Sequence, residues 1–300
     1  MTGSIPRYLE FFNKKEKIES QIIKNFFSQT FYAFQYKNLE ILNKQLEKIL
    51  KLLQIFNFIK IVGGLLKPTR IGKRVSELYI DPLTANHLIT CLQRNKKAND
   101  FAILQAISNT MEMKPLLSIK KAEFGKINET IIEQEPFLLQ PIPSPWDLEY
   151  DDFLKSIKTA MLFKEWIEEA GEDKILEKFG VTPGELRVRL NNADWLLYSM
   201  QELGLLLGLK DILKEIRKVR LRIKYGVKEE LLPLVKLKGI GRVKARKLFN
   251  SGIKTLAKLR KVPEQSLAML IGPKTAKNIK EQLGKKKEIK QEILKIRKKI

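Results

Sequence analysis

The residues with the clearest chemical meaning lie in the stretch 234–248, LVKLKGIGRVKARKL, where two glycines are followed by four basic side chains. Glycine adopts backbone angles that other residues resist and allows a close approach to a ligand. Backbone N–H groups at such a turn, where they lead into a helix N-terminus, bind anions such as phosphate. The spacing therefore predicts two short helices joined by a tight hairpin that holds phosphate groups.

The hairpin resembles the helix-hairpin-helix motif, and a degenerate second copy follows at 267–279, with Gly272 at the turn and Ala276 in the packing position. An ordinary helical turn with a solvated basic face is the alternative, but both glycines, the small Ala245 and the charge coincide here. The residues that the motif indicates for nucleic-acid binding are Gly239, Ile240, Gly241, Arg242, Lys244, Arg246, Lys247 and Lys274.

The remaining residues indicate no catalytic centre. A phosphate-loop ATPase needs GxxxxGK[ST] and an acidic Mg²⁺ ligand. Ile71–Arg74 lacks the upstream glycine and the hydroxyl residue, and Gly272–Thr275 contains an intervening proline. The single cysteine, Cys91, excludes an internal disulfide, and together with the single histidine, His87, it cannot complete a metal site. We therefore expect neither ATP hydrolysis nor a metal or cofactor in this chain, and we interpret Cys91 and His87 as packing residues.

The charge balance points to a polyanionic partner. There are 57 basic and 34 acidic residues, a formal net charge of +23, and residues 232–300 alone contain 21 basic and 4 acidic residues. A lysine bias of the kind found in thermophiles would be spread more evenly. The N-terminus lacks the apolar core of a signal peptide, and no run approaches the ~20 apolar residues of a membrane span, so we expect a soluble, cytoplasmic protein.

A second candidate surface lies on a long helix expected from Pro183 to about Leu207. Thr182–Glu185 forms a capping box with proline at the first helical position. Helical spacing predicts a buried face that carries Leu186, Leu190, Ala193, Leu197, Met200 and Gly204. The other side of the helix carries Arg187, Asn191, Trp195, Tyr198 and Glu202. Such a surface suits a single strand, because bases stack on aromatic rings and arginine contacts phosphates. The alternative is a helix buried on both sides, with Trp195 in a second core.

The elements that position these residues are almost all helical, so the expected fold class is mainly α with one small β-hairpin around Gly63–Gly64. A proline-rich loop at 133–147 interrupts the helices. In the helix expected at 147–170, apolar residues that include Trp146 and Trp166 are most simply core, and the basic helix at 210–228 is expected to be solvated. The predicted domains are an arm (1–15), a winged-helix domain (16–81) with a favoured scaffold role, a helical bundle (82–231), a helix-hairpin-helix domain (232–284) and a basic amphipathic tail (285–300).

Three stretches, 69–85 (TRIGKRVSELYIDPLTA), 182–208 and 226–253 (GVKEELLPLVKLKGIGRVKARKLFNSGI), are similar in order and spacing to the C-terminal half of archaeal Ski-two-like DNA helicases, relatives of helicase Q and of the helicase part of polymerase theta. The resemblance covers about residues 16–285. It implies a winged helix, a seven-helix Sec63-like ratchet domain and a helix-hairpin-helix domain. It also implies that the helix 183–207 follows single-stranded DNA through an arginine and a tryptophan. Trp195 matches the tryptophan, and Arg187 shares its face; Val188 and Arg189 are the other positions where the family's arginine could fall.

The resemblance further implies a function. The chain would be the DNA-handling, non-motor part of an ATP-dependent 3′–5′ DNA helicase that acts in repair or replication-fork restart and binds single-stranded or forked DNA. ATP and Mg²⁺ would bind RecA-like motor domains, which belong either to the same longer protein or to a separate chain. The alternatives are a stand-alone single-stranded nucleic-acid-binding or adaptor protein, and a ligand that is RNA.

Overall fold

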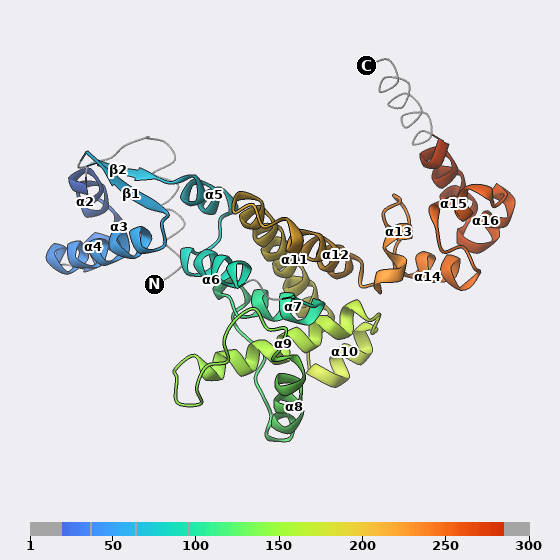
Figure 1. Ribbon diagram of the computed structural model, residues 1–300, viewed down its shortest axis with the longest axis horizontal. Coiled ribbons are helices and arrows are strands. Elements are labelled where there is room, and N and C mark those ends of the chain that lie inside the picture. The colour runs from blue at the N-terminus through green and yellow to red at the C-terminus, as the bar shows by residue number, and fades with distance from the viewer. Residues whose placement is uncertain (1–19, 37, 64, 95–96, 285–300) are drawn as a thin grey trace, which may run out of the picture. The chain divides into compact units, whose positions relative to one another are not determined.

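The computed structural model (Figure 1) describes residues 20–36, 38–63, 65–94 and 97–284. The chain divides into two compact units, residues 1–159 with 195–216 and residues 160–194 with 217–300. Within the described ranges the regular elements are helices and one two-stranded antiparallel sheet, which confirms the predicted mainly α class. The predicted arm (1–15) and basic tail (285–300) lie outside the described residues.

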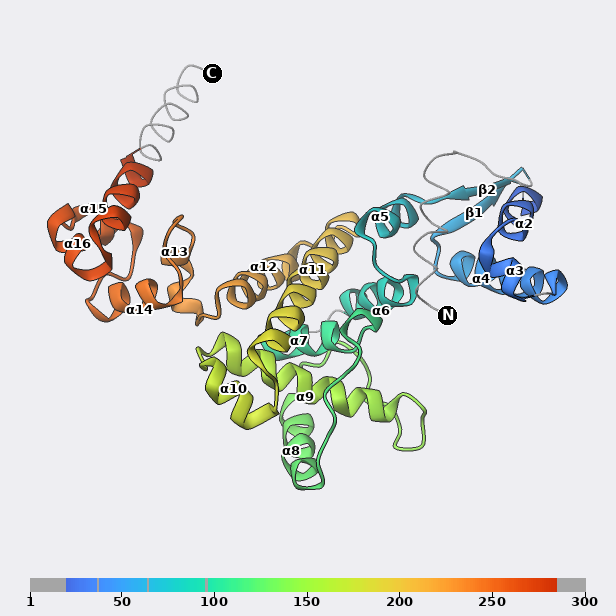
Figure 2. The same ribbon diagram turned by 180° about the vertical axis from the view of Figure 1, so that it is seen from behind.

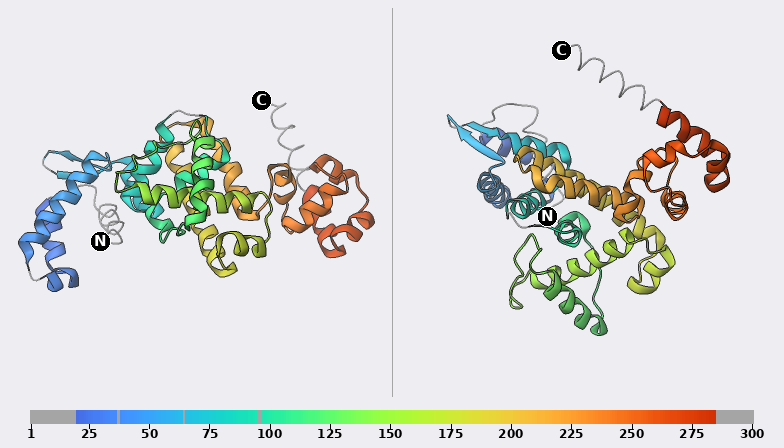
Figure 3. Two further views of the ribbon diagram at one scale, coloured as in Figure 1. Left: turned by 90° about the horizontal axis from the view of Figure 1, so that it is seen from below. Right: turned by 45° about the vertical axis from the view of Figure 1, so that its right-hand side comes forward.

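The first unit begins with helices followed by the predicted β-hairpin (Figure 3). The elements are α2 (Ser20–Ser28), α3 (Phe31–Tyr36), α4 (Leu39–Ile55), β1 (Ile59–Val62), β2 (Leu65–Pro68) and α5 (Arg70–Leu78). The side chain of Asn38 starts α4 by accepting hydrogen bonds from the amides of Glu40 and Ile41. The strands pair in register from Ile59 with Pro68 to Val62 with Leu65. This order of helices and hairpin is the one predicted for the winged helix.

The bundle part of the first unit starts at Asp81, whose carboxylate accepts a hydrogen bond from the Leu83 amide at the start of α6 (Pro82–Gln93). The Asp81 side chain is buried and lies near Glu112. Burial raises the pKa of Asp81 to about 6, against the effect of the Leu83 hydrogen bond, and the Glu112 carboxylate adds to the rise. The Asp81 carboxylate that caps α6 therefore lies in an environment that disfavours its charged form.

Asp81→Asn is expected to stabilise the protein at pH 7.5 by about 1–3 kcal/mol, because asparagine caps a helix as well as aspartate but carries no charge to bury. A carboxyl whose folded-state pKa is raised costs stability as the pH rises from about 4 through about 6. The gain should therefore disappear near pH 4, as measured by thermal unfolding at both pH values. Asp173→Asn, at an exposed position, is the control and should show no such gain.

The rest of the bundle contains α7 (Asp100–Ser108), η2 (Met111–Met113), η3 (Lys121–Glu123), α8 (Phe124–Gln134) and α9 (Tyr150–Ile167). The prediction for Trp146 was wrong, since its side chain is 93% exposed and lies outside the helix. The amide of Asp147 donates to the Ser144 carbonyl at 2.9 Å, and the Ser144 amide donates to the Asp147 carboxylate at 2.7 Å. This turn, together with the preceding prolines, delays the helix to Tyr150 and leaves Trp146 at the surface.

The remaining helices are α10 (Glu172–Phe179), α11 (Pro183–Leu206), α12 (Lys210–Tyr225), η4 (Glu229–Leu231), α13 (Leu232–Val235), α14 (Arg242–Asn250), α15 (Leu256–Lys261), α16 (Glu264–Ile271) and a helix over residues 273–284. Within the second unit, α10 lies beside the end of α9 (Figure 2), where Lys174 and Lys178 both pair with Glu165. No helix in the described part of the chain is both long and apolar enough to cross a lipid bilayer.

The long helix α11 starts as predicted. The Thr182 amide donates to the Glu185 carboxylate at 2.9 Å, and the Glu185 amide donates to the Thr182 hydroxyl at 3.4 Å. The predicted apolar face is buried at Leu186, Ala193, Leu197, Met200 and Gly204. The capping box and the helical spacing thus position the polar side of the helix.

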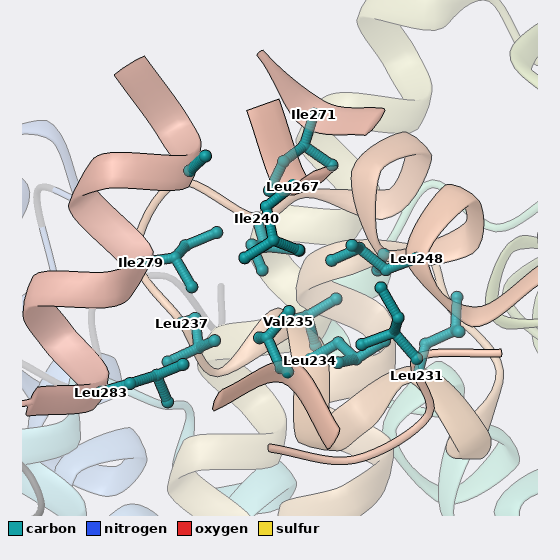
Figure 4. Packing of buried hydrophobic residues seen from close by; sticks show 14 of the residues in the cluster. Leu231, Leu234, Val235, Leu237, Ile240, Leu248, Leu267, Ile271, Ile279 and Leu283 are labelled. Carbon is teal, nitrogen blue, oxygen red and sulfur yellow. The ribbon is translucent and has the colours of Figure 1, made fainter. Parts of the chain in front are cut away.

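The helix-hairpin-helix domain has its own apolar core (Figure 4). Figure 4 shows Leu234, Val235 and Leu237 pointing toward Ile240 and Leu248, with Leu267, Ile271, Ile279 and Leu283 from the later helices around them. Ala245 and Ala276 are fully buried in this core. Small residues at these two positions let the helices approach closely, as the motif predicts.

Candidate nucleic-acid interface

The first hairpin joins α13 to α14 through Gly239 and Gly241. Gly239 has a φ of +94°, in the left-handed region that favours glycine. Gly241 is the N-cap of α14, and no side chain caps this helix. The first amides of a helix have no partner within the helix. This exposed N-terminus therefore offers N–H groups and a positive dipole end to an anion.

A second hairpin with a related geometry follows. Gly272, with a φ of +87°, precedes the helix 273–284. The Ala276 amide donates to the Gly272 carbonyl at 3.0 Å, and in the first copy the Ala245 amide donates to the Gly241 carbonyl at 2.9 Å. The ammonium of Lys244 donates to the Thr275 hydroxyl at 2.7 Å. The N-terminal turns of the two helices therefore lie side by side.

The Arg242 side chain contacts residues outside the hairpin domain. Its Nη2 donates to the Ala170 carbonyl at 2.8 Å, and its guanidinium carbon lies 5.0 Å from the centre of the Trp166 ring. Burial lowers the pKa of Arg242, although Glu169 and Glu172 act in the opposite direction. In this structure Arg242 docks the hairpin domain on the end of α9.

Arg246 also docks the hairpin domain on this region, and it makes more hydrogen bonds than Arg242. Its Nε and Nη2 donate to the two carboxylate oxygens of Glu169 at 2.9 and 2.5 Å, and its Nη1 donates to Glu230 at 2.9 Å. A two-pronged pair of this kind fixes geometry as well as charge. Of the five basic residues predicted for the hairpin, Arg242 and Arg246 are therefore engaged by residues outside the hairpin domain, and Lys244 is engaged by Thr275 within it. The sequence contains no local signal for this, because Glu169 lies 77 residues away.

The other members of the predicted set are placed differently. Lys247 and Lys274 are exposed, as are Gly239 and Gly241, while the Ile240 side chain is buried in the domain core. The Ile240 amide donates to the Leu237 carbonyl at 3.1 Å. The hairpin glycines and the two exposed lysines therefore form the accessible part of this candidate site.

On α11, Arg187 and Asn191 are exposed and line a hollow of about 510 Å³ in the second unit. Lys224 of α12 and Trp166 of α9 also line it, and sequence reasoning did not single out either for binding. Val188 is 59% exposed, whereas Arg189 is half-buried and its pKa is lowered by burial despite Glu185 nearby. Of the two arginines considered for the family's position, Arg187 is the accessible one.

Trp195 lies in the first unit and is half-buried. Its indole Nε1 donates to the Leu78 carbonyl at the end of α5, at 2.9 Å. Two further residues of the same helix side, Tyr198 and Glu202, accept hydrogen bonds from Arg74 at 3.2 and 2.6 Å. This part of α11 packs against α5, much as the second-core alternative describes. A role of Trp195 in DNA binding stays a prediction.

The basic helix α12 is less solvated than expected. Arg222 is buried, and it donates to the Ile167 carbonyl at 3.3 Å and to Glu168 at 2.7 Å. Arg220 forms a two-pronged pair with Asp194. Charge in a sequence does not distinguish such internal pairs from a solvated face.

No metal site was found among the described residues. Cys91 and His87 lie 3.7 Å apart on α6, and His87 Nε2 is 2.9 Å from the Ala106 carbonyl oxygen. Burial raises the pKa of the Cys91 thiol to about 12, which makes it unreactive. Both residues pack as interpreted from the sequence.

Comparison with known proteins matches two family models to this architecture. Residues 101–226 match the model described as archaeal helicase, domain 4, and residues 231–285 match the SAM-like helix-hairpin-helix tandem. The chain is also 37% identical over 261 residues to the ATP-dependent DNA helicase Hel308 of Methanocaldococcus jannaschii, which covers 87% of this chain and 20% of the relative. The chain is similar to the C-terminal, non-motor part of the archaeal Hel308 helicases.

Two more Hel308 helicases agree with this assignment. The protein of Methanococcus vannielii is 34% identical over 315 aligned positions (90% of this chain, 40% of the relative), and that of Pyrococcus abyssi is 33% identical over 279 (90% and 38%). The chain thus spans 20–40% of the length of the three Hel308 relatives. The Hel308 family therefore confirms the resemblance seen in the sequence, and the tandem match confirms the second hairpin.

Proposed function

We propose that the chain is the DNA-handling, non-motor part of an ATP-dependent 3′–5′ DNA helicase that acts in the cytoplasm, in repair or replication-fork restart. The observation that carries the proposal is the tandem hairpin, where two helix N-terminal turns meet through Lys244 and Thr275. Lys274 is exposed in the first turn of the second of these helices, and Lys247 is exposed in the last turn of α14. Paired helix N-termini suit two phosphates of one backbone and read no base. The similarity to ATP-dependent DNA helicases supports this reading.

In this proposal α11 guides the unwound strand and the tandem hairpin holds the strand that emerges. Arg187 and Asn191 are accessible on α11 and can contact phosphates and bases. Trp195 would contribute through the part of its ring that α5 leaves exposed. ATP and Mg²⁺ would bind RecA-like motor domains, in the same longer protein or in a partner chain.

Purified RecA-like motor domains of a Hel308 relative test the helicase role. Mixed with this chain, they should associate with it and gain DNA-stimulated ATPase and unwinding of a forked substrate. Failure to associate, with DNA binding retained, would support the stand-alone binding protein. Competition between DNA and RNA oligonucleotides of one sequence tests the nature of the ligand, and a preference for RNA would contradict the DNA assignment.

Removing Lys247 and Lys274 together, as alanines, is expected to weaken single-stranded DNA binding and to reduce the slope of log affinity against log salt by about 1.4, since each phosphate contact on a single strand contributes ~0.7. Fluorescence anisotropy with a labelled oligonucleotide at several salt concentrations measures both effects. Lys126→Ala, an exposed lysine of α8, is the matched control. An unchanged slope in the double variant would contradict the hairpin site.

A further inference from the structure

Apolar side chains form part of the lining of the hollow beside Arg187. Leu186 and Leu190 of α11, Ile223 of α12 and the indole of Trp166 line it, and all belong to the second unit. The indole is held in place, because its Nε1 donates to the Ile223 carbonyl at 2.8 Å and Arg242 lies over its ring. A volume of about 510 Å³ is within the range of sites that enclose a small molecule or a cofactor. A hollow of this size, with an indole in its wall, can hold a group as large as a nucleobase.

Two cations on different helices are among the residues that line the hollow. Arg187 of α11 and Lys224 of α12 both line it, and both are exposed. Among the described residues neither forms an ion pair, and Lys224 has only the Tyr225 ring, 5.7 Å from its ammonium. The nearby Asp194 carboxylate is already bound by Arg220 at 2.9 and 3.2 Å. Both cations are therefore available to an anionic ligand.

The lining of the hollow also offers hydrogen-bonding groups. Asn191 and Glu172 line the hollow and are exposed. An amide and a carboxylate can bond to the polar edges of a nucleobase. Apolar side chains, two polar side chains and two cations from different helices match a base with its flanking phosphates. An acidic peptide would satisfy the cations but would leave the apolar side chains of the lining unused.

We propose that the hollow receives one unstacked base of a single strand, with the flanking phosphates held by Arg187 and Lys224. The inference rests on the proposed function and adds to it a base-binding recess and a phosphate contact on α12. Unstacking costs a few kcal/mol, which burial against apolar walls offsets. Because every base presents an apolar face, the recess tolerates any sequence, as a moving strand requires.

Two variants of the full chain test the phosphate contact and the recess separately. Lys224→Ala removes the cation, with Lys214→Ala, an exposed α12 lysine outside the hollow, as its control. Leu190→Phe fills the recess and leaves the charges unchanged, with Leu176→Phe on α10 as its control. Each protein is titrated with a 12-nucleotide single strand and with an abasic strand of the same length and charge.

Lys224→Ala should weaken binding of both strands roughly two- to fivefold, as expected for one solvent-exposed charge contact. Leu190→Phe should weaken binding of the natural strand roughly fivefold or more, the value of one buried base, and leave the abasic strand unaffected. Equal effects of Leu190→Phe on the two strands, or a Lys224→Ala affinity equal to that of Lys214→Ala, would overturn the proposal.

If the proposed function as a whole is wrong, the same measurements give a different set of results. If the unaltered chain binds neither strand, both the proposed function and the recess are wrong. If it binds DNA, and the Lys247 and Lys274 variant weakens it while the hollow variants do not, only the recess is wrong. A 12-residue polyglutamate peptide that competes with the strand, and whose binding also depends on Lys224, would assign the hollow to a protein ligand and overturn the base assignment.

Discussion

Replacing Glu169 with alanine is expected to lower the free energy of unfolding of the second unit by about 2–4 kcal/mol. Its carboxylate accepts two hydrogen bonds from Arg246 and one from the Lys228 amide at 3.1 Å, and its side chain is only 16% exposed. Without it, the guanidinium of Arg246 keeps the Phe249 ring and Glu230, a carboxylate that is more exposed than that of Glu169. Urea denaturation followed by circular dichroism measures the loss.

A glycine variant at position 169 separates the stability contributed by the ion pair from the cost of the backbone conformation. Glu169 has a φ of +73°, in the left-handed region, which costs a residue with a Cβ roughly 1 kcal/mol. Glu169→Gly should therefore lose about 1 kcal/mol less stability than Glu169→Ala. Glu177→Ala, at an exposed position of α10, controls for the loss of a surface charge. Equal losses for glycine and alanine would show that the pair does not hold a strained residue.

The pair also makes stability depend on pH. Burial acts to raise the pKa of Glu169, but the hydrogen bonds from Arg246 and Lys228 outweigh it, so the pKa lies below its ordinary value of 4.5. A folded-state pKa below the unfolded one gives stabilisation that is complete above about pH 4.5 and is lost as the pH falls through the folded-state value. The stability difference between the unaltered chain and Glu169→Ala should therefore be full at pH 7 and shrink below about pH 4. A constant difference over this range would contradict the charge pairing.

Gly72→Ala is expected to destabilise the first unit by about 3 kcal/mol or more, because overpacking against backbone cannot be relieved by a side-chain rotation. A Cβ on Gly72 would lie 1.9 Å from the Phe58 carbonyl oxygen and 2.7 Å from its carbon. The Thr69 hydroxyl holds this approach by donating to the Asn57 carbonyl at 2.7 Å and accepting from the Gly72 amide at 3.0 Å. Thermal unfolding measures the loss.

Gly125→Ala in α8 is the matched control for Gly72. A Cβ there meets nothing within 4 Å, so alanine should leave stability unchanged or raise it by up to about 1 kcal/mol. Similar losses in the two variants would show that the close contact between α5 and the Phe58 backbone, just before β1, is not what makes Gly72 necessary.

Local rules were enough for most of the fold. The capping box at Thr182 and the proline at position 183 predict where α11 starts. The two hydrogen bonds between Thr182 and Glu185 confirm this start. The hairpin around Gly63 follows from two apolar runs beside glycine. These features depend on neighbours in sequence, so they can be read without knowledge of the tertiary structure. The predicted start of the helix at 147–170 was wrong, because the Ser144–Asp147 turn and the prolines before it compete with the helical pattern.

The candidate site was less predictable, because a charged side chain pairs with residues that are close in space but can be distant in sequence. Arg242 and Arg246 lie in a basic run that suggests phosphate, yet they contact Ala170 and Glu169, which the chain brings back from far away in sequence. The indole N–H of Trp195 is likewise taken by the carbonyl of Leu78. Which of several similar cations stays accessible depends on these long-range contacts.

By itself, then, the sequence determined the glycine hairpins, the helix caps, the concentration of positive charge near its end and the family resemblance, since each depends on residue type and short spacing. The tertiary structure decided that Arg187, Lys247 and Lys274 are accessible while Arg242 and Arg246 dock the hairpin domain on the end of α9. It also brought Lys224 and Trp166 to one hollow with Arg187. The physical reason is that burial and pairing of a charge depend on every helix packed around it, and no local pattern records those neighbours.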